Sequence, residues 1–254
     1  DRGCIMTTVK NIYDYINSIA PFDTQEEWDN SGHLVGDFRA EVKRVVLSLD
    51  ATQEAVSYCA DVNADLLLTH HPVIFSKLAD VKSGSVVYEL VKNNIACISA
   101  HTNFDKAECG INANLAELLE IKNTEPYCDG FIRIGELDGE MSIDDFAGFV
   151  ENKLNVSGIR YTECDNVIKK VAVGGGSCGE FMDYAINNAD CFVTGDLKYH
   201  EMLDAYEQGK AVISAGHFET ESFAFLMIKD KLEKIFTDVE FLVAPVSNPI
   251  KTAE

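Results

Sequence analysis

Short apolar runs alternate with segments of helical periodicity along the chain. The runs are almost continuously apolar, which is typical of strands covered on both faces. They predict strands at Arg44–Asp50, Asp65–Thr69, Ile95–Ala100, Phe131–Ile134, Ile159–Thr162, Lys170–Val173, Cys191–Thr194, Ala211–Ser214 and Glu240–Ala244. The segments between them predict helices at Thr8–Ala20, Gln53–Val62, Ser85–Asn93, Gly110–Leu119, Ile143–Leu154, Gly179–Asn188, Lys198–Glu207 and Phe218–Lys234. This alternation predicts an α/β fold with largely parallel sheets covered by helices.

A polar segment, Lys122–Gly130, divides this pattern near the middle of the chain. Proline and glycine within it favour a break between elements. The second half repeats the strand–helix order of the first. We therefore expect two α/β halves, one over residues 6–125 and the other over residues 126–254.

The composition is that of a globular protein with an unusual charge. The 254 residues are 46% hydrophobic and 25% charged, enough to bury a sizeable core. The net charge is −21, from 21 Lys+Arg against 42 Asp+Glu. Such a surface repels phosphate backbones and anionic lipid, so we expect no nucleic-acid wrapping and no membrane binding.

Cysteine usage and hydropathy bear on the compartment. No run approaches the roughly 18 apolar residues that span a bilayer, and the first residues lack the pattern of a signal peptide. The eight cysteines form no CxxC pair, and several lie in apolar runs where a thiol packs as a small hydrophobe. We expect a reduced, cytoplasmic protein.

Histidines and carboxylates follow three of the predicted strands. In parallel α/β sheets, ligands bind beyond the carboxyl ends of the strands. Four of the six histidines of the chain occur at such positions. The residues in these three clusters are His70, His71, His101, Asp105, His217 and Glu221.

These residue types favour a divalent metal site. Imidazole and carboxylate together bind zinc, iron, manganese or cobalt. On a helix, His217 and Glu221 are four residues apart and share one face. His70 and His71 point in opposite directions on a strand unless the chain turns there. A single buried histidine is more often structural, but three clusters of matching chemistry favour metal, and two carboxylates can bridge two ions.

Several motifs identify a family. The segments LLLTHHPVIF, HTNFD, TGDLKYHEMLDA and GHFETE, with the amino-terminal WDNSGHLVGD, closely resemble those of the GTP cyclohydrolase 1 type 2 homologues, also called the NIF-three-like family. The resemblance extends from about Met6 to Pro245, and the length is that of members without an inserted middle domain. It implies a toroidal homohexamer of subunits with two α/β halves. One departure is His33, where the family usually has an apolar residue.

The resemblance also implies a site for two divalent ions, of zinc, iron, manganese or cobalt. Its metal ligands are then His70, His71, Asp105, His217 and Glu221. Glu221 is expected to bridge the two ions, and His101 to lie just outside the direct ligands.

The function we expect is hydrolysis of a small substrate through a metal-bridging hydroxide. A nucleotide or a cyclic C–N compound is a candidate substrate, and His101 and His200 are candidate catalytic residues. The alternative is a non-enzymatic metal-binding or interaction scaffold that uses the same ligands. Catalysis needs an open coordination position, and a scaffold does not.

Other residues allow two interpretations each. The Gly174–Gly176 loop either holds a phosphate or an oxyanion at its backbone amides, or is a tight turn for steric reasons. Asp196 or His200 either relays protons or orients a substrate, or Asp196 caps the following helix. We favour capping for Asp196 and expect His200 at the pocket rim. Trp28 either lines the cavity mouth or packs structurally, which we favour. Three phenylalanines are expected in the core: Phe75, Phe218 and Phe223.

Overall fold

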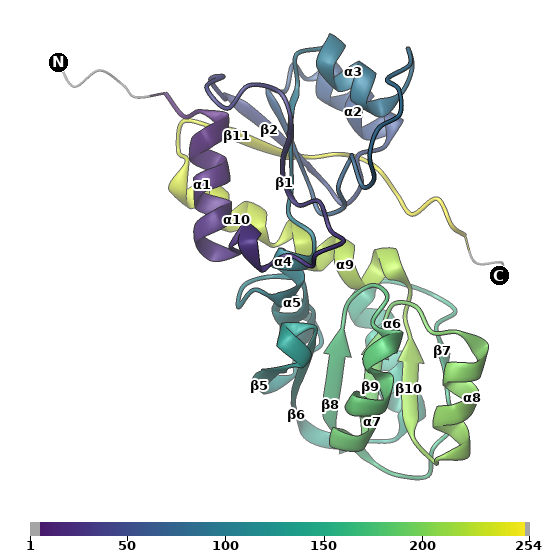
Figure 1. The fold of residues 1–254 in the computed structure, drawn as a ribbon. Coiled ribbons are helices and arrows are strands. Elements are labelled where there is room, and N and C mark those ends of the chain that lie inside the picture. Colours follow the sequence, from purple (N-terminus) through teal and green to yellow (C-terminus); the bar gives the residue numbers. More distant parts are fainter. Residues whose placement is uncertain (1–5, 252–254) are drawn as a thin grey trace. The chain divides into compact units, whose positions relative to one another are not determined.

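The computed structural model describes residues 6–251, which form two compact units (Figure 1). Of the described residues, the first unit contains residues 6–104 together with Leu226–Ser247. The second contains Asp105–Phe225 and residues 248–251. Each unit has its own sheet. The fold is α/β, as predicted.

The sheet of the first unit is largely parallel. Its order is β1-β4-β3-β2-β11, and only the edge strand β1 is antiparallel to its neighbour. The strands are β1 (Gly32–Val35), β2 (Arg44–Ser48), β3 (Leu66–Thr69), β4 (Ala96–Ser99) and β11 (Glu240–Val243). Ser48 is in register with Thr69, and Thr69 with Ser99. The residues that follow these three strands therefore emerge at one edge of the sheet.

The second sheet is mixed. Its order is β5-β6-β8-β9-β10-β7, with parallel pairing only among the central strands β8, β9 and β10. The strands are β5 (Lys122–Tyr127), β6 (Ile132–Met141), β7 (Arg160–Tyr161), β8 (Ile168–Gly174), β9 (Cys191–Thr194) and β10 (Ala211–Ser214). Gly174, Thr194 and Ser214 are in register, so the parallel strands end side by side.

Helices cover both sheets. In the first unit these are α1 (Val9–Ile19), α2 (Gln53–Asp61), α3 (Val86–Lys92), α4 (Thr102–Lys106) and α10 (Ile228–Ile235). In the second they are α5 (Ile111–Leu118), α6 (Ile143–Leu154), α7 (Met182–Asn188), α8 (Tyr199–Glu207) and α9 (His217–Leu226), and α4 and α9 each run across a unit boundary. Short 3-10 turns lie at Phe22–Thr24, Cys128–Gly130 and Gly179–Phe181.

Side-chain caps explain where several helices begin. The hydroxyls of Thr8, Thr52, Ser85 and Ser142 each accept a hydrogen bond from a backbone amide in the first turn of α1, α2, α3 and α6. Such caps satisfy amides that have no partner inside the helix.

Each sheet has its own apolar core. In the first unit, Val46, Leu67 and Cys97 of neighbouring strands pack with residues of α2 and α3, such as Val56 and Leu90. In the second unit, a matching cluster joins strands β6, β8, β9 and β10 to α7 and α8. Packing in each core holds the neighbouring strands of that sheet in fixed register with one another.

The division between the units differs from the predicted one. The prediction set it between residues 125 and 126, but the chain divides after Phe104, and Leu226–Ser247 returns to the first unit. The reason is sheet pairing, because β11 adds beside β2, whereas α5 and β5 contact β6. The polar segment expected to be a linker is itself the edge strand β5. The helix expected over Phe218–Lys234 is two helices, α9 and α10.

Cysteines and hydropathy add two findings. The seven cysteines in the described part are free thiols, and Cys4 lies outside the described residues. Burial raises the pKa of Cys59 and of Cys97 to about 12, so both remain protonated thiols. Among residues 6–251, no helix has the length and apolar content needed to cross a bilayer.

Candidate metal centre

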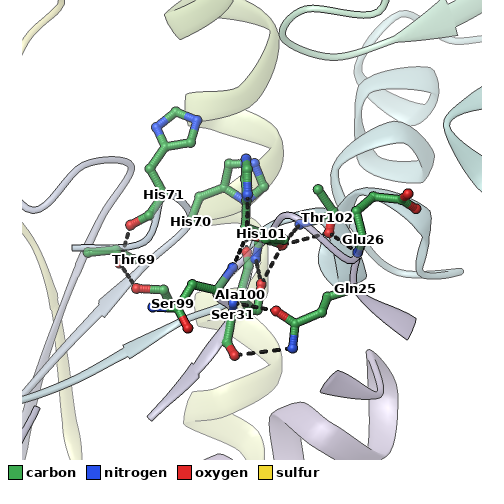
Figure 2. A network of polar contacts seen from close by, with 12 residues as sticks. Gln25, Glu26, Ser31, Thr69, His70, His71, Ser99, Ala100, His101 and Thr102 are labelled. Atoms are coloured by element: carbon green, nitrogen blue, oxygen red, sulfur yellow. Dashed lines mark hydrogen bonds and ion pairs between the residues drawn. The ribbon is translucent and has the colours of Figure 1, made fainter. Parts of the chain in front are cut away.

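The chain turns sharply where β3 ends. The backbone amides of His70 and His71 both donate to the Leu49 carbonyl, and the Thr69 hydroxyl donates to the His71 carbonyl. Thr69 also shares a 2.7 Å hydrogen bond with Ser99 at the end of β4 (Figure 2). On a regular strand His70 and His71 would point in opposite directions. Because the chain turns here, both side chains can face the same side.

His101, just after β4, completes a cluster of three histidines with His70 and His71. One ring nitrogen from each lies within 4.8 Å of the others, the spacing expected of ligands to one ion. The ring centroids are 5.0 to 5.4 Å apart. The rings of His70 and His101, which overlap in the view of Figure 2, meet edge-to-face at 70°. The His70 side chain is fully buried. The first unit therefore contains a histidine group that could hold a metal ion.

Each of these histidines is anchored at Nδ1. His70 Nδ1 donates to the Ala100 carbonyl at 2.7 Å. His71 Nδ1 lies 2.7 Å from the Asp50 carboxylate, and His101 Nδ1 lies 2.9 Å from that of Asp29. A hydrogen bond at one ring nitrogen fixes the tautomer and directs the other nitrogen to the metal. In each ring this leaves Nε2 as the nitrogen that could face an ion.

Asp29 is the most firmly held of these carboxylates. Its side chain is fully buried. Besides His101, it accepts hydrogen bonds from the Thr102 amide, the Thr102 hydroxyl and the Ser31 hydroxyl at 2.6 to 3.1 Å. Burial alone would raise the pKa of Asp29, but the hydrogen bonds from His101 and Thr102 outweigh it and hold the pKa well below its ordinary value. Asp29 is therefore a fixed anion behind His101.

The second unit carries the other group, at the start of α9. His217 opens this helix and Glu221 follows one turn later, with Nε2 and the carboxylate 3.2 Å apart. His217 Nδ1 is 2.7 Å from Asp196, which follows β9. The hydrogen bond with Glu221 outweighs burial, and with help from Asp196 it raises the pKa of His217 to about 9. The two carboxylates thus favour the protonated imidazole of His217.

Asp105 lies near Glu221 in the same unit. A carboxylate oxygen of Asp105 is within 4.8 Å of one of Glu221, although 116 positions separate the two residues. Glu221 is only 4% exposed. Two nearby carboxylates in a largely buried position suit a cation of high charge.

The glycine loop after β8 shapes the place of Glu221. The Gly175 amide donates to Asn112 Oδ1 at 2.8 Å, and the Gly176 amide donates to the Thr220 hydroxyl at 3.0 Å. These amides therefore already have acceptors, which favours the tight turn over the phosphate-binding alternative. Gly176 has a φ of +62°, and a Cβ there would overlap the Glu221 carboxylate. Only glycine meets both conditions.

Several predictions about individual residues were wrong. Asp196 does not cap α8, which begins after Lys198. It pairs with His217 instead. Trp28 is 58% exposed, not packed in the interior, and Phe75 and Phe223, expected in the core, are 54% and 48% exposed.

The remaining candidates divide between the two units. Of the five predicted ligands, His70 and His71 belong to the first unit, and Asp105, His217 and Glu221 to the second. That they bind the same ions stays a prediction. His200 lies exposed on α8 with its ring against Tyr199, so its place at a pocket rim also stays a prediction. Phe218 is half-buried.

The anchoring carboxylates Asp29 and Asp50 were missed from sequence. Asp50 and Asp196 also follow strands, so the strand-end rule that found the histidines could have found them. Asp29 had no such signal, since it pairs with a residue 72 positions away.

Fold and side chains together define a class: an α/β protein with carboxylate-anchored histidines that could hold metal. The chain belongs to the Duf34/NIF3 (NGG1p interacting factor 3) family, whose model matches residues 7–249. It is 34% identical to a GTP cyclohydrolase 1 type 2 homolog of Clostridium perfringens, over 93% of this chain and 95% of the relative.

Solved structures agree with this membership. Reduced HcgD from Methanocaldococcus jannaschii superposes with a TM-score of 0.83 at 29% identity, over 94% of this chain and 98% of its own. A Bacillus cereus protein related to NIF3 superposes with a TM-score of 0.89 at 22% identity, over 98% and 100%. The second likeness shows the fold alone.

Proposed function

We propose that this protein binds two divalent metal ions and uses them to hydrolyse a small substrate. The proposed ligands are His70, His71, Asp105, His217 and Glu221. The proposal makes one site of ligands from both units.

The observation that carries the proposal is the anchoring of the histidines. Each of the three ligand histidines has its Nδ1 bound to a carbonyl or a carboxylate at 2.7 Å. Metal-binding histidines are oriented in this way, and the carboxylate partner makes the imidazole a stronger donor. A histidine with only a packing role does not need a carbonyl or carboxylate fixed at Nδ1. The donor set, imidazole and carboxylate, fits zinc, iron, manganese or cobalt.

The protein's own residues would prepare the reaction. A pair of bound divalent ions supplies Lewis acidity and lowers the pKa of water toward about 7. Gly176 leaves room for Glu221 between the strand ends of the second unit. Asp29 holds His101 so that its Nε2 faces His70 and His71, and we propose that His101 moves a proton there.

The substrate class rests on the relatives. Several are named GTP cyclohydrolase 1 type 2 homologs. That name supports a nucleotide with a cyclic C–N bond as the first substrate to test. Phosphoesters and cyclic amides are the next, because two metal ions also polarise these groups.

Metal analysis tests the binding step. The protein is prepared with Mn²⁺ or Zn²⁺ in excess, desalted, and its metal measured per subunit by mass spectrometry. We expect two ions per subunit, fewer in His70→Ala and Glu221→Ala, and wild-type content in His33→Leu, a histidine of β1 outside the cluster. Fewer than one ion per wild-type subunit would contradict the proposal.

Turnover separates the enzyme from the scaffold alternative. The loaded protein is screened against nucleotides, phosphoesters and cyclic amides. Activity that disappears in Glu221→Ala and persists in His33→Leu supports a hydrolase. Two bound ions without turnover across the panel favour a metal-binding scaffold.

A further inference from the structure

Two exposed aromatic rings lie beside the histidine cluster of the first unit. Trp28 is 58% exposed and Phe75 is 54% exposed. The two ring centroids are 6.0 Å apart. The centroid of Trp28 lies 5.9 Å from that of His101, and the centroid of Phe75 lies 6.2 Å from it. Both meet His101 edge-to-face, at 74° and 71°.

The two rings are brought together by polar contacts of their neighbours. Trp28 precedes Asp29, whose buried carboxylate holds His101 and Thr102. The Asn30 side-chain amide donates to the carbonyl of Ile74, the residue before Phe75. This hydrogen bond joins chain segments 44 positions apart, next to the two rings in sequence. The pair is a positioned feature, not two chance exposures.

Exposed aromatic pairs also occur elsewhere in the chain, as at Tyr127 and Tyr184, whose centroids are 5.8 Å apart. Indole and phenyl rings gain most by burial, and adjacent exposed ones mark binding sites. Other exposed rings, such as Tyr199 and Tyr206, lie on α8 of the second unit. The Trp28–Phe75 pair differs because it borders polar groups able to bind metal.

We propose that Trp28 and Phe75, whose ring planes are inclined at 45°, form an aromatic platform for a planar heteroaromatic ring. The ligand ring stacks on one of the two and packs against the other at an angle, with a polar edge toward His101. The proposal deepens the proposed function and rests on it, since the metal site supplies the polar end of the ligand. Flat π-faces stack on indole and phenyl rings whatever their substituents. Ring nitrogens and oxygens along one edge can form hydrogen bonds at the histidine cluster, which a purely aliphatic ligand cannot do. The class includes the bases of nucleotides.

The single tryptophan makes the test specific, because all indole fluorescence reports Trp28. Zinc-loaded protein is titrated with GMP, UMP and nicotinamide mononucleotide, and with ribose 5-phosphate as the matched ligand without a ring. Excitation at the red edge of the indole band avoids absorption by the bases. We expect saturable quenching by at least one of the three nucleotides and none by ribose 5-phosphate.

Variants identify the platform. Phe75→Leu keeps the reporter and is expected to weaken nucleotide binding about tenfold. Tyr206→Leu, an exposed ring on α8, is the control and is expected to bind as wild type does. Circular dichroism of both variants checks that they fold. Unchanged affinity in folded Phe75→Leu would overturn the proposal.

The two proposals fail differently. No quenching by any nucleotide, in protein that carries its metal, overturns the platform and leaves the metal site intact. Nucleotide-specific quenching in protein that binds no metal supports the platform and refutes the metal function. Acrylamide adds a third check: if it cannot quench Trp28 in the ligand-free protein, another protein surface covers the rings and the platform is wrong.

Discussion

At the scale of single residues, the candidate centre depends on carboxylates outside the proposed ligand set. Asp50 shows this best, because its side chain is 44% exposed and contributes little to the core. Its carboxylate holds His71 at Nδ1. Asp50→Asn is expected to lower metal affinity roughly 10- to 100-fold, since His71 loses its fixed tautomer. Competition with a chromophoric chelator measures the change.

The matched control for Asp50→Asn is Asp37→Asn. Asp37 is an exposed carboxylate of the same unit that bonds only with nearby Arg39. Its replacement is expected to leave metal affinity unchanged. Equal affinities in the two variants would show that the His71–Asp50 contact does not orient a ligand.

His33 provides a prediction about pH. Burial of its ring lowers its pKa below the ordinary 6.5, although the Val35 backbone and Asp37 oppose the shift. The unfolded chain then binds more protons than the folded one, so stability is lost as pH falls from about 6.5 toward the folded pKa. His33→Leu, which restores an apolar residue, is expected to flatten the decline in stability between pH 7 and pH 5. Urea unfolding of wild type and His33→Leu across this pH range measures the decline. The difference in stability between the two proteins at pH 8, where His33 is neutral in both the folded and the unfolded chain, gives the contribution of packing alone.

Sequence showed the ligand residues more readily than their supports. Strong apolar runs mark the strand ends, so the histidines after them could be found. The role of Asp29 depends on its contact with His101, which is 72 positions away. The placement of Trp28 beside Phe75 depends on the hydrogen bond from the Asn30 side chain to the Ile74 carbonyl. Neither has a local signature, because both arise from tertiary packing.

At the scale of elements, the loop between β8 and α7 positions Glu221, and a pair of glycines isolates this effect. Gly176 and Gly209 have nearly the same backbone, with φ of +62° and +65°. A Cβ at Gly176 would overlap Glu221, whereas one at Gly209 meets nothing within 4 Å. Both alanine variants are expected to lose about 1–2 kcal/mol of stability from left-handed strain.

Only Gly176→Ala is expected to lower metal affinity as well, because its methyl group displaces the Glu221 carboxylate. Chemical denaturation and chelator competition measure the two effects separately. Equal metal affinity in Gly176→Ala and Gly209→Ala would show that the Gly176 loop does not position Glu221 for metal binding.

Element boundaries were predicted less well where strands lie at sheet edges. The edge strand β5 is mostly exposed and polar and contains Pro126, which an edge tolerates. Its sequence therefore resembled a linker. The central strands were found within a few residues, because burial on both faces requires the continuous apolar run by which they were predicted.

At the scale of the whole molecule, the charge of −21 bears on assembly. We propose the homohexamer that family resemblance implies. Copies of such an acidic chain repel each other, and salt screens that repulsion. Light scattering is expected to give six times 28.0 kDa at physiological salt, with smaller species at low ionic strength. A monomer at every salt concentration would contradict the proposal.

Double variants test whether the ligand groups of the two units bind the same ions. His71 belongs to the first unit and His217 to the second. If the units bind separate ions, the losses of binding free energy in His71→Ala and His217→Ala add in the double variant. If they share ions, removing either ligand already disrupts the common cluster, and the double variant loses less than the sum. We expect this second result, with a coupling of about 0.5–3 kcal/mol, measured by metal titration of all four proteins. Additive losses would mean two independent sites, and the dinuclear hydrolase would then lack its shared centre.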